Sequence, residues 1–230
     1  MSKYVLVPDS FKGTMTSREI CEIMQHAIER IDSDAKIISV PVADGGEGSV
    51  DAFLSALGGE RKAITVTGPH FEKLSSSYGI TADGTAVIEM SACAGLPLVY
   101  GKKNPEITTT YGVGELICDA ARSGARRIVI GLGGSATNDG GCGAAAAAGV
   151  RFYDKSGKNF IPVGRTLKDI ASIDYSGLDS ALTGISISAM CDVDNPLLGE
   201  AGAANVFGPQ KGANAAMIAR LDAGLRHLAE

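Results

Sequence analysis

Carboxylates, lysines and glycines gather in four segments of the sequence, at points where strands are expected to end. The last segment holds Asp192 and Asp194 directly after a β-branched run, with Lys211 a short distance further on. Two carboxylates at a strand end suit a general base or a metal ligand, and a lysine ahead of a helix suits contact with an anion. Asp, Asn and Pro are also ordinary turn residues, so a plain strand-end turn is the alternative.

The first segment is Asp9-Ser10-Phe11-Lys12-Gly13. Lys12 follows a predicted strand and precedes a predicted helix N-terminus, where a lysine can hold a phosphate or a carboxylate. A solvated loop lysine explains the motif equally well. The pattern GxxxxGK[ST] is absent from the sequence, so this segment is not a Walker A loop.

The second segment places Asp44, Gly45, Gly46 and Glu47 after another predicted strand. Open α/β sheets bind ligands at the carboxyl ends of their strands, so Asp44 could coordinate Mg²⁺ or hydrogen-bond substrate hydroxyls. Either carboxylate could instead cap the following helix. The capping role is favoured for Glu47 and the site role for Asp44.

The third segment, residues 131–141, is the richest in glycine. Gly131, Gly133 and Ala136 fit the dinucleotide-binding pattern G-x-G-x-x-A, and Asp154 follows at the end of the next predicted strand. Turn-forming Asn, Asp and Gly residues late in the segment argue against a helix that starts inside that pattern. A long polar loop of this kind suits a triphosphate or a small polyol, and a purely structural glycine loop is the alternative.

The elements that position these segments begin with two strand–loop–helix units. Tyr4–Val7 is expected to be a buried strand, and Thr16 with Glu19 forms a capping box for the apolar helix that follows. Ile37–Val42 and Val50–Leu57 repeat the plan as strand and helix. This alternation predicts a parallel sheet with helices on its faces.

A second architecture is expected to begin near residue 70. Tyr78–Ala82 and Thr85–Met90 flank Asp83-Gly84, a strong signal for an antiparallel hairpin with a type I′ turn. We therefore assign residues 1–70 to one domain and residues 71–230 to another. Later elements are predicted at Gly114–Ser123 (helix), Arg126–Ile130, Val150–Tyr153 and Ile185–Met190 (strands), and Ala215–Ala229 (helix).

The composition excludes several classes of function. A net charge of −5 and the absence of Trp argue against a nucleic-acid partner, because phosphate backbones are held by clustered Lys and Arg. Five widely spaced cysteines without a CxxC pair favour reduced thiols over disulfides or a zinc site. No signal sequence is found, nor an apolar run of the ~18 residues that span a bilayer. We therefore expect a cytoplasmic protein without a membrane partner.

Taken together, six stretches of the sequence resemble the bacterial ATP-dependent glycerate kinase family, and they occur in the family's order. They are Pro8–Gly13, Pro41–Gly48, Thr108–Gly112, Gly133–Gly141, Cys191–Leu197 and Val206–Gly212. Each stretch alone is a weak signal, whereas all of them in one order are very specific.

This resemblance implies a kinase that uses ATP and Mg²⁺ to phosphorylate a hydroxyl of glycerate. It also implies two unlike α/β domains. One is flavodoxin-like (Rossmann-like) and built from both ends of the chain, and the other is a mixed α/β domain inserted between them. The predicted boundary near residue 70 agrees with that plan, and the oligomeric state is left open, a homodimer included.

The same resemblance assigns roles to individual residues. Ser10 and Lys12 would bind an anionic group, Asp44 would contact substrate or metal, Asp192 would accept the proton, and Lys211 would stabilise charge. Lys12 and Lys211 thereby join Asp192 as the predicted catalytic residues. The remaining predicted contacts are Asp194 for the metal and, for substrate or nucleotide, Gly45, Gly46, Gly133, Gly134, Ser135, Thr137, Asn138 and Asp139.

One departure and two competing functions accompany the resemblance. Family members continue well beyond residue 230, so the opening units are expected to lack sheet neighbours and to expose apolar surface, as in a truncated chain. A nicotinamide-dependent oxidoreductase would instead use Gly131, Gly133, Ala136 and Asp154. A non-catalytic nucleotide- or sugar-acid-binding module would bind ligand without turnover.

Overall fold

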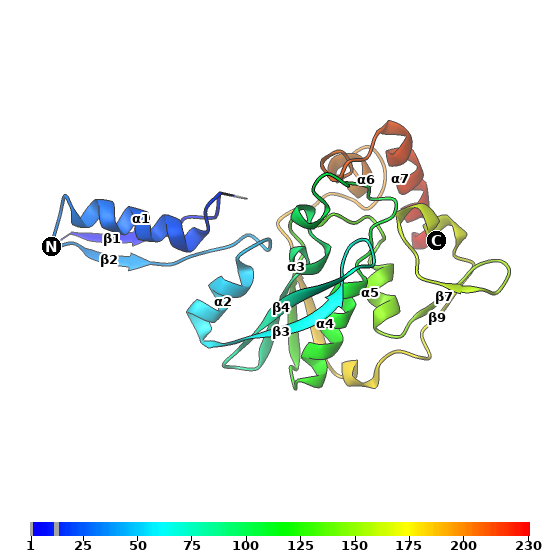
Figure 1. The fold of residues 1–230 in the computed structure, drawn as a ribbon, viewed down its shortest axis with the longest axis horizontal. Helices are drawn as coiled ribbons and strands as arrows, with labels where there is room; N and C mark the ends of the chain where they lie inside the picture. The colour runs from blue at the N-terminus through cyan, green and yellow to red at the C-terminus, as the bar shows by residue number, and fades with distance from the viewer. Residues whose placement is uncertain (1, 12–13) are drawn as a thin grey trace.

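The computed structural model describes residues 2–11 and 14–230, which form a projecting N-terminal unit and a larger main body (Figure 1). The N-terminal unit consists of strand β1 (Lys3–Leu6), helix α1 (Ser17–Glu29) and strand β2 (Lys36–Ser39). The two strands pair in parallel, so the predicted parallel arrangement of the opening strands is confirmed.

Helix α1 begins at the predicted capping box. The Thr16 amide donates to Glu19 Oε2 at 2.7 Å, and the Glu19 amide donates to Thr16 Oγ1 at 3.2 Å. Ile23 on the same helix is 57 % exposed, because the sheet beneath the helix has two strands. The expected burial of the first strand is wrong, whereas the expectation that the opening units lack sheet neighbours and expose apolar surface is confirmed for the described residues. Val5 is 55 % exposed, since the described residues place no further strand beside β1 and β2.

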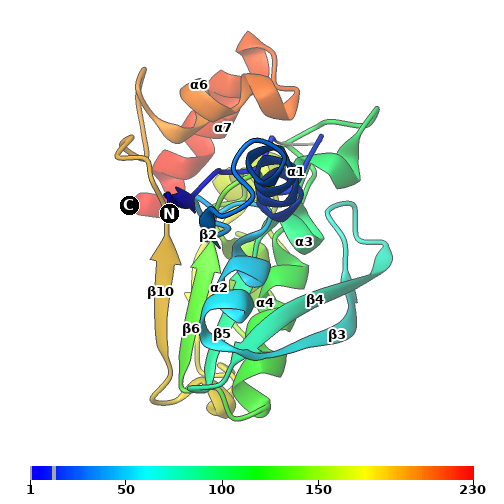
Figure 2. The ribbon, with the colours of Figure 1, turned by 90° about the vertical axis from the view of Figure 1, so that its left-hand side faces the viewer.

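A five-stranded mixed sheet forms the centre of the main body, with the strand order β10-β6-β5-β4-β3 (Figure 2). Its strands are β3 (Gly59–Thr67), β4 (Lys73–Thr81), β5 (Thr85–Glu89), β6 (Arg127–Gly131) and β10 (Ser186–Met190). Strands β10, β6 and β5 are parallel, whereas β5, β4 and β3 are antiparallel neighbours. The three parallel strands therefore end at one edge of the sheet, where ligand sites of α/β proteins are found.

Helices α2 (Ser49–Leu57) and α4 (Tyr111–Arg122) cover the two faces of this sheet. On β4, Tyr78 points at α4, because its hydroxyl donates to Asp119 Oδ2 at 2.6 Å. The neighbouring Gly79 faces α2, where an added Cβ would lie 2.9 Å from a side chain of the helix. Adjacent strand residues point to opposite faces, so the two helices enclose the sheet between them.

The hairpin of β3 and β4 spans the position of the predicted domain boundary. The strands pair from Gly59 opposite Thr81 to Thr67 opposite Lys73, so residue 70 lies in their connecting turn. The chain changes sheet between β2 and β3 instead, within residues 40–58. The change of sequence pattern near residue 70 therefore marks a turn between two strands of one sheet.

The second hairpin, from β4 to β5, is confirmed, but its turn differs from the prediction. Gly84 has a φ of +80°, whereas Asp83 is not among the residues with positive φ, and the Gly84 amide donates to the Thr81 carbonyl at 2.9 Å. A type I′ turn requires positive φ at both central residues. The connection is therefore a longer loop with glycine in its left-handed position.

A second layer completes the main body. Its antiparallel sheet, in the order β8-β7-β9, consists of β7 (Arg151–Tyr153), β8 (Asn159–Phe160) and β9 (Ser172–Asp174). The remaining helices are α3 (Ser91–Ala94), α5 (Cys142–Ala147), α6 (Ala203–Phe207), α7 (Ala215–Ala229) and the 3₁₀ segments Leu96–Val99, Gly164–Asp169, Ser180–Leu182 and Pro209–Lys211. Helix α7 has the predicted bounds. Across residues 2–11 and 14–230, no helix has the length and apolar character needed to cross a bilayer.

Candidate active site

The loops after β2, β6 and β10 come together at the carboxyl edge of the main sheet. The Gly133 amide donates to the Gly45 carbonyl at 3.0 Å, which joins the loop after β6 to the loop after β2. The Leu132 amide donates to the Met190 carbonyl at 3.3 Å, which joins the same loop to the end of β10. Three segments that are far apart in the sequence are thereby held at one place.

Close backbone packing explains the glycines of these loops. A Cβ atom on Gly131 would lie 2.3 Å from the Gly45 carbonyl oxygen, and one on Gly133 would lie 2.8 Å from Gly46 Cα. Gly45 has a φ of +93°, a conformation that favours glycine. The structural explanation of the glycine-rich loop therefore applies to Gly131 and Gly133, which let the two loops touch.

A cavity of about 270 Å³ lies where the loops meet. Asp44, Ser135, Asp192 and Lys211 form its polar side. The other lining residues include Leu132, Gly133, Gly134, Met190, Val193 and Phe207. The structure thus brings predicted residues from the second, third and fourth segments to one site.

Lys211 is the buried cation of this site, with 8 % of its surface exposed. Its Nζ donates to Ser135 Oγ at 2.9 Å and to the Thr137 carbonyl at 2.6 Å. Burial lowers the pKa of Lys211 to about 8, and the negative charge of Asp139 opposes that shift. An ammonium group has three donors, so one N–H remains for a ligand.

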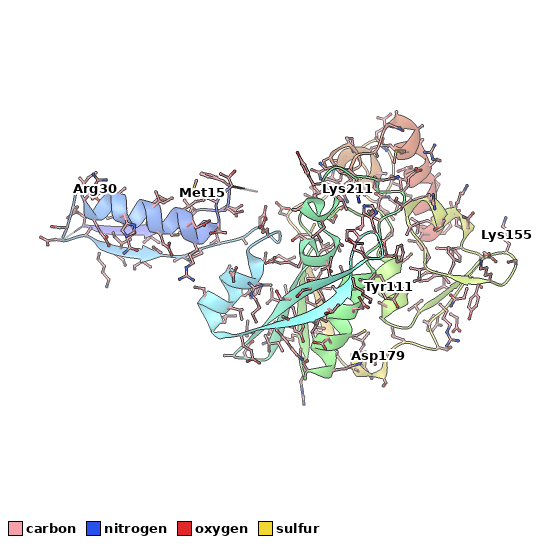
Figure 3. The ribbon with its side chains drawn as sticks, in the orientation of Figure 1. Met15, Arg30, Tyr111, Lys155, Asp179 and Lys211 are labelled. Carbon is pink, nitrogen blue, oxygen red and sulfur yellow. The ribbon has the colours of Figure 1, made fainter. Side chains whose placement is uncertain are left out.

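Figure 3 shows Met15 at the end of the N-terminal unit that is nearer to Lys211, and Arg30 at the far end.

The two carboxylates of the cavity come from different loops. Asp44 Oδ1 accepts a hydrogen bond of 3.1 Å from the Gly46 amide, which holds the side chain over its own loop. Asp192 is exposed and follows the end of β10, so a ligand can reach its oxygens directly. Ionised carboxylates accept hydrogen bonds and protons, and the cavity combines two of them with one buried cation.

Other predicted residues lie elsewhere. Ser10 lines a separate cavity of about 110 Å³ that also touches Glu47, and Lys12 lies outside the described residues. Asp194 is exposed and does not line the cavity that holds Lys211, so its prediction as a metal ligand is not supported by the geometry. Within the described part of the chain, no three His, Cys, Asp or Glu side chains are grouped to hold a metal ion.

Thr137, Asn138 and Asp139 are predicted ligand contacts, but the structure buries all three behind the cavity wall. The Thr137 carbonyl holds Lys211, and the Asp139 carboxylate accepts hydrogen bonds from the chain's own backbone. Asn138 Nδ2 is buried without a hydrogen-bond partner. These residues support the site from within the protein.

Glu89, which the sequence analysis missed, organises the start of α2. It ends strand β5, is 9 % exposed, and its Oε1 accepts a hydrogen bond of 2.8 Å from the Val50 amide. The predicted capping role of Glu47 is wrong, since the N-cap residue of α2 is Gly48, which has no side chain, and Glu47 is exposed. Burial raises the pKa of Glu89. The sequence feature that could have identified Glu89 is a carboxylate at the end of an apolar strand.

The dinucleotide-binding pattern does not assemble into a dinucleotide site. Helix α5 begins at Cys142, well after Ala136, and β7 belongs to a different sheet from β6. Asp154 accepts hydrogen bonds from Ser156 and from the Lys158 amide in a surface turn. A βαβ unit with its acidic residue on the ribose is therefore not formed.

The sequence matches the glycerate kinase family over residues 4–230. Glycerate 2-kinase of Escherichia coli K12 and glycerate kinase of Bacillus subtilis 168 are each 48 % identical to it, over 99 % of this chain and 60 % of the relative. The crystal structure of a Salmonella typhimurium LT2 protein described as glycerate kinase 2 superposes with a TM-score of 0.86 at 44 % identity, covering 99 % of this chain and 62 % of that one. The chain spans about three fifths of the length of the relatives it matches.

Proposed function

Because the chain belongs to the glycerate kinase family, we propose that the protein transfers the γ-phosphoryl group of ATP to a hydroxyl of glycerate. One observation carries the proposal. Asp44, Ser135, Asp192 and Lys211 line a single cavity at the carboxyl ends of the parallel strands. Phosphoryl transfer requires a cation near the moving charge, an acceptor for the hydroxyl proton and a polar pocket that positions both substrates. The cavity has each of these parts.

Lys211 supplies the positive charge in this mechanism. Its ammonium is fixed by Ser135 and Thr137, so it meets the transferring phosphoryl group without reorganisation, and the remaining N–H donates to a phosphate oxygen. Asp192 accepts the proton of the attacking hydroxyl, since it is an exposed carboxylate that lines the same cavity as Lys211.

Mg²⁺ fits the donor set of this cavity. Mg²⁺ is usually bound by one or two carboxylates together with substrate phosphates, rather than by a cage of protein ligands. Asp44 provides such a carboxylate beside Asp192 and Lys211. We assign Asp44 to hold the ion, which when bound neutralises charge on the phosphates of ATP.

The hydroxyl that is phosphorylated is proposed from one relative. The name of the Escherichia coli relative, at 48 % identity, specifies the 2-hydroxyl. We propose the same hydroxyl here. The ³¹P spectrum of the product distinguishes the two esters, because a phosphate on the C2 methine gives a doublet and one on the C3 methylene gives a triplet. A triplet would overturn the 2-hydroxyl, and the absence of any phosphate ester would overturn the kinase.

The N-terminal unit is proposed to belong to a flavodoxin-like domain. A parallel pair of strands with one helix and exposed residues such as Val5 and Ile23 is an incomplete layer. We propose that the boundary of this domain lies after β2, within residues 40–58, because β2 and β3 belong to different sheets. Hydrogen exchange of β1 and β2 in the full gene product tests the assignment, because completion of the layer would protect their amides and an unchanged exchange rate would count against it.

A further inference from the structure

The proposed function gives no role to the buried threonines Thr108–Thr110, although each is at most 2 % exposed. Thr108 Oγ1 donates to the Ala136 carbonyl at 2.8 Å. Thr110 donates its amide and its hydroxyl to Asp139 Oδ2, each at 2.8 Å. The threonines therefore fix the loop after β6 at two points, one on each side of Thr137.

Thr137 is the residue whose carbonyl holds Lys211 at 2.6 Å. Because the loop is anchored at Ala136 and at Asp139, this carbonyl has a fixed position, and so has the ammonium that donates to it. The anchors thus determine where the positive charge of the site lies.

Asp139 is held as a carboxylate. Its side chain is 1 % exposed, and it accepts from Thr110 and from the amides of Gly141 and Gly143, at 3.2 Å each. Thr110 Oγ1 also accepts from the Ala144 amide at 2.9 Å, so its single proton is directed at Asp139. Burial raises the pKa of Asp139 and these hydrogen bonds oppose the rise. The four hydrogen bonds that Asp139 accepts favour its ionised form.

The buried ammonium of Lys211 needs a negative charge nearby to compensate it. The side chain is buried, and its two hydrogen-bond partners, a hydroxyl and a carbonyl, are neutral. Asp44, Cys191 and Asp192 line the same cavity as Lys211, and Asp139 lies two residues after Thr137, whose carbonyl holds the ammonium. A buried ammonium with neutral ligands is stable only when a nearby negative charge compensates it.

We propose that Asp139, clamped by Thr110, is a positioning residue that fixes Lys211 in the cavity and keeps it positively charged. The catalytic use of that charge rests on the proposed function, whereas the coupling between Asp139 and Lys211 does not. The coupling is therefore tested by a measurement that requires no turnover.

The test follows the ionisation of Lys211 by NMR of ¹³C-labelled lysine in the full gene product, with the signal assigned by Lys211→Arg. In Asp139→Asn the titration midpoint of Lys211 is expected to fall by ~1 pH unit, a tenfold loss of proton affinity. A folded Asp139→Asn protein with an unchanged midpoint would overturn the proposal.

Thr110→Val is the matched control, since it removes the hydroxyl donor and leaves the charge of Asp139. We expect its Lys211 midpoint to stay near that of the wild type. A fall as large as that in Asp139→Asn would show that loosening of the loop, and not the charge, moves Lys211, and would overturn the electrostatic role.

The reciprocal variant covers the case in which Asp139→Asn does not fold. Lys211→Met removes the cation and keeps an apolar chain of similar length, so the titration midpoint of the Asp139 carboxyl group should rise. An unchanged midpoint would overturn the coupling.

In an active enzyme, the alkaline limb of kcat/KM should move with the Lys211 midpoint in Asp139→Asn. Coupling seen by NMR in a protein that does not phosphorylate glycerate would leave Asp139 in its role and reject the proposed function.

Discussion

The carbonyl oxygen of Thr137 accepts a hydrogen bond of 2.6 Å from the ammonium of Lys211, although the two residues are 74 positions apart in the sequence. This contact joins the loop after β6 to the segment that precedes α7. It places a buried positive charge at the carboxyl ends of the parallel strands, facing Asp44 and Asp192.

Activity should depend on the protonation of Lys211. Its pKa is lowered to about 8, so the ammonium is present below that pH and is lost as the pH rises through it. We expect kcat/KM to fall above pH ~8. Lys211→Met should lower kcat by a factor of ~10²–10³, the cost of removing one preorganised donor. Lys211→Arg keeps its charge at all these pH values and should abolish the alkaline limb; persistence of the limb would assign it to another group.

Asp192 should be required for turnover and Asp194 should not. Asp192→Asn keeps the shape of the side chain and removes the proton acceptor, so kcat should fall by a factor of ~10²–10⁴. Asp194→Asn is the matched control, because Asp194 is exposed beside the same strand end but outside the cavity. Steady-state kinetics compare the two, and normal turnover by Asp192→Asn would remove the base assignment.

Gly133→Ala should separate packing from backbone strain. Its Cβ would lie 2.8 Å from Gly46 Cα, so the two loops must move apart at a cost of ~1–3 kcal/mol. Gly184→Ala is the control, since it has a φ of +76° and open space around it, at the other end of β10. Urea unfolding should show a loss of stability for both variants. Only Gly133→Ala should lose activity, and equal activity losses would contradict the role of this contact.

Glu89 should make stability decrease with rising pH. Its pKa is raised above the ordinary 4.5 by burial, so the folded protein binds its proton more tightly than the unfolded chain. The free energy of unfolding should therefore fall as the pH rises from 4.5 through the folded pKa, relative to Glu89→Gln, which has no such group. Thermal melts across this range provide the measurement, and parallel curves for wild type and Glu89→Gln would refute the prediction.

Local features of the fold could be predicted from the sequence, because their causes lie within a few residues. The Thr16–Glu19 capping box and helix Ala215–Ala229 are examples. The sheet to which β3 belongs could not be predicted, since whether it pairs with β2 or with β4 is a long-range choice. Burial of the first strand failed for the same reason, because it depends on neighbours outside the local pattern.

The candidate site was predicted in part. Asp44, Ser135, Asp192 and Lys211 could be selected because strand-end polar residues converge in α/β sheets. The hydrogen bonds of Asp139 and Glu89 to backbone amides could not be predicted. The sequence around a carboxylate at a loop or strand end does not tell whether the side chain faces a ligand or a backbone amide. That difference is decided by tertiary packing.

The central claim, that this cavity phosphorylates glycerate, is tested most directly by glycerate-dependent formation of ADP from Mg-ATP. The full gene product and the 230-residue chain should be assayed together. We predict ADP formation by the full gene product that saturates with glycerate and is lost in Lys211→Met. A well-folded full gene product that releases no ADP in response to glycerate would contradict the account and favour a module that binds ligand without turnover.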